Sequence, residues 1–247
     1  MQTHWFYTVW PFIGIGGAIV IVAILLLTDT FRGNTTVSRW RDPMWLAWLA
    51  VPLYWIHQFE EYSLPVIGLD YSIQEMICKN LGFPPYPDCP IPLAFYPVVN
   101  IALMWFGAPL AAYLFRRNVL IGLSFWGLLL ANGLLHTAGG IAAGGYNTGL
   151  WSAAFLFVPL SLWVIYVSAI RGPYSGKVVG VASAAGAVTH VLLFAGYGLY
   201  KNGMMGNAGL LVYAAVIGFM PIILAAIASR FFKPGSLRAG PVLRATT

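Results

Sequence analysis

The sequence alternates long apolar runs with short polar segments. Each run has the length of a transmembrane helix, which takes about 20 residues to cross the hydrocarbon core of a bilayer. The runs are continuous, whereas strands of a membrane β-barrel alternate apolar and polar positions over segments of about ten residues. The sequence therefore predicts one all-α integral membrane domain over residues 1–247, folded as a seven-transmembrane-helix bundle. The predicted spans are 10–27, 44–62, 97–115, 119–143, 150–170, 178–200 and 207–232.

Local signals support several of these boundaries. Asp42-Pro43 has the residue types preferred at the N-cap and first position of a helix. Gly176, Gly180 and Ala184 follow one another at four-residue spacing, so we expect this face of the sixth span to contact a neighbouring helix closely. The first span lacks the basic leader and the cleavage site of a signal peptide, so we interpret it as a transmembrane helix.

Composition and charge agree with a membrane location. With 60% hydrophobic and 8% charged residues, the chain has too few polar residues to cover a soluble globule of its size. The net charge is +6, but the basic residues gather at the ends of apolar runs, which indicates membrane orientation and argues against a nucleic-acid partner. Of the 13 Lys and Arg residues, all but Lys79 and Lys201 fall on one side. The positive-inside rule then predicts an outside N-terminus, a cytoplasmic C-terminus with a basic tail at 234–247, and the cell (plasma) membrane as the location.

Residues 63–95 form the long connection and are predicted to lie outside the membrane. Ser72 and Glu75 have the spacing of a capping box, and the apolar residues that follow share one face. Residues 72–81 are therefore predicted to form a helix lying in the interface. Cys78 and Cys89 both fall in this loop, where an oxidising exterior would allow a disulfide; two buried free thiols are the alternative.

Rare polar residues in three of the spans fall at one depth of the membrane. The second, fourth and sixth spans all begin on the predicted cytoplasmic side, so residue offsets convert to heights at about 1.5 Å each. The intramembrane polar groups then lie about 18 to 26 Å above that side. Since ionisable groups in lipid are costly, we expect these groups to face the interior and to form one cluster. The cluster comprises His57, Glu60, Glu61, Asn132, His136 and His190.

The order and spacing of these residues resemble a known family. The motif His-x-x-Glu-Glu begins at His57 and is followed by Asn-x-x-x-His at 132–136 and by a Tyr-Asn-x-Gly turn at 146–149. This pattern is similar to that of the HXXEE motif family of uncharacterised multi-helix membrane proteins. The resemblance covers the second to the fifth span, and the family usually has Pro at the position of Thr148. It implies a membrane-helix fold and no particular activity.

Three imidazoles and two carboxylates form a ligand set that borderline divalent metals prefer. The sequence therefore leads to the hypothesis of a mononuclear zinc or iron site. Glu60 would act as general base on a metal-activated water, and Asn132 would orient a ligand or polarise a substrate. A carboxylate-bridged diiron site usually takes Glu and His ligands from more helices than are offered here. The expected metal ligands are His57, Glu61, His136 and His190.

Each of these residues also has a plainer interpretation. His190 stands alone on its helix and is equally well explained as an interhelical hydrogen-bond partner. Glu61 lies near the predicted membrane boundary, where a solvated end-of-helix carboxylate is the alternative. The seventh span contains no lysine, which excludes a retinal Schiff base.

The favoured interpretation is a metal-dependent membrane enzyme acting on a lipid or another hydrophobic small molecule that enters from the outer leaflet. Hydrolysis by metal-activated water is the first choice, and oxidation by iron and O2 is the second. A metal-free isomerase or cyclase, with Glu60 as an acid, is the closest alternative. A proton-coupled transporter would also place His and Glu inside a helical bundle, although the cytoplasmic halves of these spans offer no matching polar groups.

Overall fold

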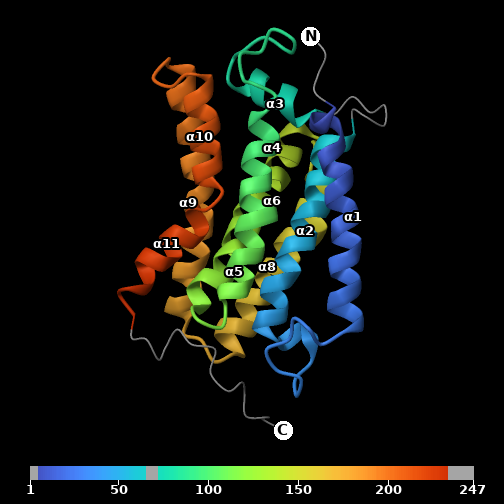
Figure 1. Cartoon of the computed structure of the whole chain (residues 1–247), viewed down its shortest axis with the longest axis vertical. Helices are drawn as coiled ribbons and strands as arrows, with labels where there is room; N and C mark the ends of the chain where they lie inside the picture. Colours follow the sequence, from blue (N-terminus) through green and yellow to red (C-terminus); the bar gives the residue numbers. More distant parts are fainter. Residues whose placement is uncertain (1–4, 65–71, 233–247) are drawn as a thin grey trace.

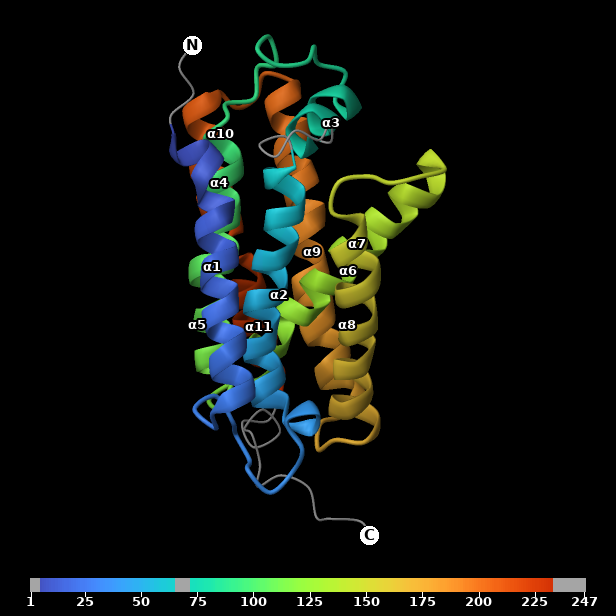
Figure 2. The ribbon, with the colours of Figure 1, turned by 90° about the vertical axis from the view of Figure 1, so that its right-hand side faces the viewer.

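The computed structural model describes residues 5–64 and 72–232, and these ranges are built from helices joined by loops (Figures 1 and 2). The predicted basic tail at 234–247 lies outside them. In the described part of the chain, three short π-helical sections continue neighbouring α-helices with a wider turn. They are η2 (Ile101–Gly107), η3 (Ala153–Phe157) and η4 (Tyr166–Ile170). The α-helices are α1 (Phe6–Leu27), α2 (Pro43–Ser63), α3 (Ile73–Asn80), α4 (Phe95–Asn100), α5 (Ala108–Leu114), α6 (Val119–Ala143), α7 (Leu150–Ser152), α8 (Val158–Ile165), α9 (Gly176–Lys201), α10 (Asn207–Ile217) and α11 (Met220–Ser229).

Within the described residues, five helical rods are long and apolar enough to cross a membrane, which suggests a membrane protein. They are α1, the rod Phe95–Leu114, α6, the rod Leu150–Ile170 and α9. The pair α10 and α11 would make a sixth span, but it is bent by 51°. α2 is not among them, because His, Gln and Glu lower its hydropathy. Most of its side chains are nevertheless buried, and it packs against α1, α5 and α6.

Proline accounts for most departures from regular α-helix. Pro109 follows the π-helical section η2, and Pro159 follows η3. Proline has no N–H and its ring displaces the carbonyl one turn earlier, so a locally widened helix accommodates it. The predicted seventh span, 207–232, is a bent pair of helices, α10 and α11. It is interrupted at Gly218 and Phe219, and α11 restarts with Pro221 in its first turn.

α6 and α9 cross at two glycines. A Cβ at Gly127 would lie 2.1 Å from the Ser183 carbonyl oxygen, and one at Gly186 would lie 2.0 Å from the Ser124 carbonyl oxygen. The close face of α9 was expected at Gly176, Gly180 and Ala184. That expectation is wrong, since the first two have open space around them and Ala184 is exposed. Beyond the crossing, α6 leans away from the bundle toward its C-terminal end (Figure 2).

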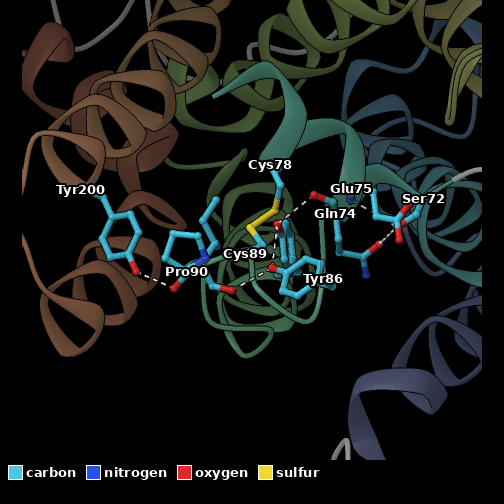
Figure 3. Close-up of a disulfide and its surroundings, with 10 residues drawn as sticks. Ser72, Gln74, Glu75, Cys78, Tyr86, Cys89, Pro90 and Tyr200 are labelled. Carbon is cyan, nitrogen blue, oxygen red and sulfur yellow. Dashed lines mark hydrogen bonds between the residues drawn. A yellow bond between two sulfur atoms is a disulfide. The ribbon is translucent and has the colours of Figure 1, made fainter. Parts of the chain in front are cut away.

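Residues 72–94, which precede α4, fold over one end of the bundle. The helix α3 within them is capped by Ser72, whose Oγ accepts a hydrogen bond from the Glu75 N–H at 3.3 Å. Cys78 and Cys89 are joined by a disulfide (Figure 3). The Tyr200 hydroxyl, at the end of α9, donates a hydrogen bond to the carbonyl of Pro90 at 2.5 Å. These contacts tie the loop to α9 and fix α3 above the helices.

We expect Gly186→Ala to destabilise the fold. The added methyl group meets backbone atoms of α6 on a rigid crossing, and such overpacking typically costs about 1 to 3 kcal/mol. Gly180→Ala is the matched control on the same helix, because nothing lies within 4 Å of its Cβ position. Thermal unfolding in detergent micelles should show a lowered midpoint for Gly186→Ala alone. Equal midpoints for the two variants would contradict the close crossing.

Candidate functional site

The rotation of α2 about its axis is set by a buried amide network. The Gln58 side-chain N–H donates to Asn100 Oδ1 at 3.1 Å, and the Trp105 indole N–H donates to Gln58 Oε1 at 3.3 Å. Gln58 is thereby directed toward the α4 to α5 rod. His57 and Glu61, one turn apart on another face of α2, are turned toward α6 and α7.

Three side chains from two helices converge at this level. Glu61 Oε1 lies 3.4 Å from His57 Nε2 and 3.1 Å from His136 Nε2. These three potential ligand atoms all lie within 4.8 Å of one another. For comparison, tetrahedral ligands at about 2.0 to 2.1 Å from zinc lie about 3.3 Å apart. His57 is fully enclosed and Glu61 is only 5% exposed, while His136 is partly buried.

Hydrogen bonds assign the protons on both imidazoles. His136 Nδ1 lies 2.8 Å from the carbonyl oxygen of Thr148, which can only accept, so Nδ1 carries the hydrogen. His57 Nδ1 lies 2.7 Å from Ser152 Oγ. That hydroxyl donates its proton to Glu60 in a short hydrogen bond, so it accepts from His57. In the neutral rings both Nε2 atoms therefore keep a lone pair directed toward Glu61.

Glu60 serves a different set of partners from Glu61. Its carboxylate accepts hydrogen bonds from the Tyr146 hydroxyl at 2.9 Å, the Trp151 N–H at 2.9 Å and the Ser152 N–H at 2.8 Å, besides the Ser152 hydroxyl. In a helix of 3.6 residues per turn, the two glutamates point about 60° to one side and about 40° to the other side of His57. Glu60 was predicted as a general base. In the structure both of its carboxylate oxygens accept hydrogen bonds from the segment 146–152, and the role as a base stays a prediction.

The turn at 146–149 supplies both the supporting contacts and the space for the rings. Gly149 has φ of 82°, and a Cβ there would lie 2.7 Å from His57 Cε1 and 3.0 Å from the His136 ring. Glycine is therefore required both by the backbone and by the rings. Thr148 acts on His136 through its carbonyl group, which a proline at this position would retain. Burial, and then the hydrogen bond to Glu60, raise the pKa of Tyr146, so its hydroxyl stays a donor at neutral pH.

A cavity of about 460 Å³ adjoins the group and includes Glu61 and His136 in its wall. Its other walls come from α3, α9, the α4 to α5 rod and the end of α10. A volume of this size suits a small-molecule ligand. Asn132 and His190 line the same cavity.

The structure thus brings three of the four expected ligands together and leaves His190 outside the group, in the wall of the cavity. Asn132 is buried in that wall, and its Oδ1 has no hydrogen-bond partner in the part of the chain that the structure describes. Sequence reasoning missed Ser152 and the carbonyl of Thr148. The Tyr-Asn-x-Gly turn that contains Thr148 was the available signal, but nothing in its spacing relates Ser152 to α2.

A family model described as "Protein of unknown function with HXXEE motif" matches residues 48–164. The matched section begins in α2 and ends in α8, so it contains the motif, the turn at 146–149 and Ser152, while His190 lies beyond it. The resemblance to this family is confirmed over that section. No curated protein and no solved structure matches the chain.

Proposed function

We propose that this protein is a membrane-embedded, metal-dependent enzyme that hydrolyses a lipid or another apolar substrate. The observation that carries the proposal is the convergence of the Nε2 atoms of His57 and His136 with one carboxylate oxygen of Glu61. The Nδ1 atom of each histidine donates a hydrogen bond elsewhere, to Ser152 and to the carbonyl of Thr148 respectively. Histidines that bind metals almost always donate their other ring N–H in this way, which fixes the tautomer and the ring orientation.

The donor set indicates zinc or iron. Two histidines and one carboxylate leave coordination positions open, as catalytic zinc sites do and structural sites do not. The same set is the facial triad of non-haem iron oxygenases, so oxidation by iron and O2 is the second reaction within this proposal. A bound zinc ion would supply Lewis acidity and an activated water.

The residues of this chain have separate tasks under this proposal. His57, Glu61 and His136 hold the ion. Ser152 and Glu60 orient His57 and are positioning residues, since neither touches the cavity. Asn132 faces the cavity and orients the substrate.

A metal-free acid–base enzyme, an isomerase or cyclase of hydrophobic substrates, is the second candidate. The 3.1 Å contact between Glu61 and His136 supports it, because an imidazolium and a carboxylate would form a charge-assisted hydrogen bond at this distance. Proton-coupled transport is less favoured. The buried cluster between the site and Asp42 is largely apolar within the described residues, with large side chains such as Trp45, Leu46 and Trp126.

We further propose that α2 and the α10 to α11 pair both cross the membrane, which gives seven spans with the N-terminus outside the cell (plasma) membrane. α2 needs less hydropathy than its neighbours because it is enclosed by them and has little contact with lipid. The disulfide in the loop over α3 agrees with an oxidising exterior on that side.

Cysteine labelling tests this topology. The native cysteines are paired, so we expect a membrane-impermeant maleimide to label Met204→Cys in intact cells. Thr35→Cys, in the exposed loop at the opposite end of the bundle, should react only after permeabilisation. Labelling of Thr35→Cys alone in intact cells would contradict the proposed orientation. Equal labelling of both variants in intact cells would place Thr35 and Met204 on the same side and contradict an odd number of membrane crossings between them.

Metal content tests the site. Protein loaded with zinc or ferrous iron and then desalted should retain about one ion per chain, and His57→Ala or His136→Ala should abolish retention. Ser152→Ala removes the hydroxyl that accepts a hydrogen bond from the metal ligand His57, and it should weaken the affinity for the metal ion by about 10 to 100-fold. Ser161→Ala, another buried serine of the same rod, is the matched control and should change nothing. A wild-type protein that retains no ion would favour the metal-free candidate.

Isotope incorporation tests the reaction. Metal-loaded protein incubated with total membrane lipid extract in ¹⁸O-labelled water should release a product that carries the label, detected by mass spectrometry, because hydrolysis adds water across the broken bond. Glu61→Gln should release none, since it removes the charged ligand. A product of unchanged mass without label would instead identify an isomerase or cyclase.

A further inference from the structure

The cavity that adjoins Glu61 and His136 continues from them toward the end of the bundle where α2 and α6 begin (Figure 2). On α2 its wall runs from Glu61 back to Tyr54, and on α6 it runs from His136 back to Leu128. At about 1.5 Å per residue, these separations correspond to about 10 to 12 Å along the helices. The two helices thus give similar depths for this part of the cavity, which we call the deep pocket.

Close contacts between helices lie beneath the deep pocket. Leu128 follows Gly127, where α6 approaches the backbone of α9. Leu103 and Ile217 also line the cavity, and α10 approaches η2 beside them, since a Cβ at Gly218 would lie 2.7 Å from the Leu103 backbone nitrogen. The three lining side chains are apolar and buried. The deep pocket is therefore closed at its inner end by Leu103, Leu128 and Ile217, which we call the floor.

The cavity opens sideways at the level of His136. Leu135 of α6, which directly precedes His136, and Phe194 of α9 line the cavity and are 45% and 54% exposed. The two helices separate beyond their contact at Gly127 and Gly186 (Figure 2). Both helices are long and apolar enough to cross a membrane, so this gap would face the hydrocarbon of a bilayer. A chain of any length can leave the cavity through it.

These walls restrict the two ends of a bound lipid differently. When a bond of the lipid lies beside Glu61 and His136, one end extends into the deep pocket and the other end leaves between α6 and α9. An extended chain advances about 1.2 Å per bond, as a polypeptide backbone does at about 3.3 to 3.6 Å per residue. The deep pocket is therefore long enough for about eight to ten bonds, whereas the gap sets no limit.

We infer that the deep pocket binds one hydrocarbon chain of up to about ten carbons and that the floor residues set this limit. The remainder of the lipid leaves between α6 and α9. The substrate class is therefore a lipid with one short chain next to the bond at which the reaction occurs. The inference rests on the proposed function for the position of that bond, while binding of the chain is measured without turnover.

Dialkyl ketones test this limit on metal-depleted protein in detergent micelles. Each ketone carries an octadecyl chain on one side of the carbonyl and a butyl, octyl, dodecyl or hexadecyl chain on the other. Native mass spectrometry of the protein with an equimolar mixture gives the bound share of each ketone. We expect the butyl and octyl ketones to be bound about tenfold more than the dodecyl and hexadecyl ketones, because a longer chain overpacks the floor.

Variants of the floor should change the limit. Leu128→Ala, and Leu103→Ala on the neighbouring rod, enlarge the deep pocket and should raise binding of the dodecyl ketone to that of the octyl ketone. Leu128→Phe fills the pocket and should reduce binding of the octyl ketone, while the butyl ketone still binds. Leu134→Phe is the matched control on the same helix. The Leu134 side chain is 53% exposed and lies outside the cavity, so this variant should keep the wild-type pattern.

Equal binding of the four ketones, or binding of none, would overturn the inference. A limit that stays the same in Leu128→Ala, Leu103→Ala and Leu128→Phe would also overturn it, because other residues would then form the floor. Dialkyl ketones cannot be hydrolysed and the protein carries no metal, so failure here leaves the metal and isotope experiments unaffected. Failure of those experiments likewise leaves the chain limit in place.

Discussion

The hydrogen bonds that Glu60 accepts from residues 146–152 hold the site together. Glu60 is half-buried, and a carboxylate withdrawn from water in this way is stabilised by the donors around it. Here two backbone N–H groups at the start of α7 and the hydroxyls of Tyr146 and Ser152 provide them. Once the segment is docked on Glu60, Ser152 is placed against His57 and the carbonyl of Thr148 against His136. A side chain outside the group of His57, Glu61 and His136 therefore sets the geometry of that group.

The backbone around this contact is unusual for the same reason. Gly149 fits between two imidazole rings with a left-handed backbone that other residues adopt at a cost. Directly after Ser152 the helix widens into η3, ahead of Pro159. Widened turns of this type occur frequently at functional sites. Together these features bring a tight turn close to α2 and still allow the rod to continue through the bundle.

The sequence predicted more of the fold than of the site. Apolar runs and Asp42 located most helix boundaries within a few residues, because burial in lipid and helix capping are local constraints. The convergence of His57, Glu61 and His136 followed from helical rise and facing. The division between Glu60 and Glu61 did not, since both lie within about 60° of His57 and only the docked segment distinguishes them. The crossing at Gly127 and Gly186 also depends on which helices are neighbours, which spacing alone leaves open.

Under the proposed hydrolysis, a second cavity would be the approach for water. It has about 480 Å³ and is lined by the turn at 146–148 and by residues of α3 and the loop after it, among them the charged Glu75 and Lys79. Met76 and Asn147 belong to the walls of both cavities. A hydrolase of lipids needs an apolar approach for one reactant and a polar approach for the other. Asn147, in the turn that supports the histidines, lines both cavities and donates a hydrogen bond to the backbone carbonyl of His136, whose Nδ1 donates to the carbonyl of Thr148. Under the proposed hydrolysis, His136 would therefore lie where lipid and water meet.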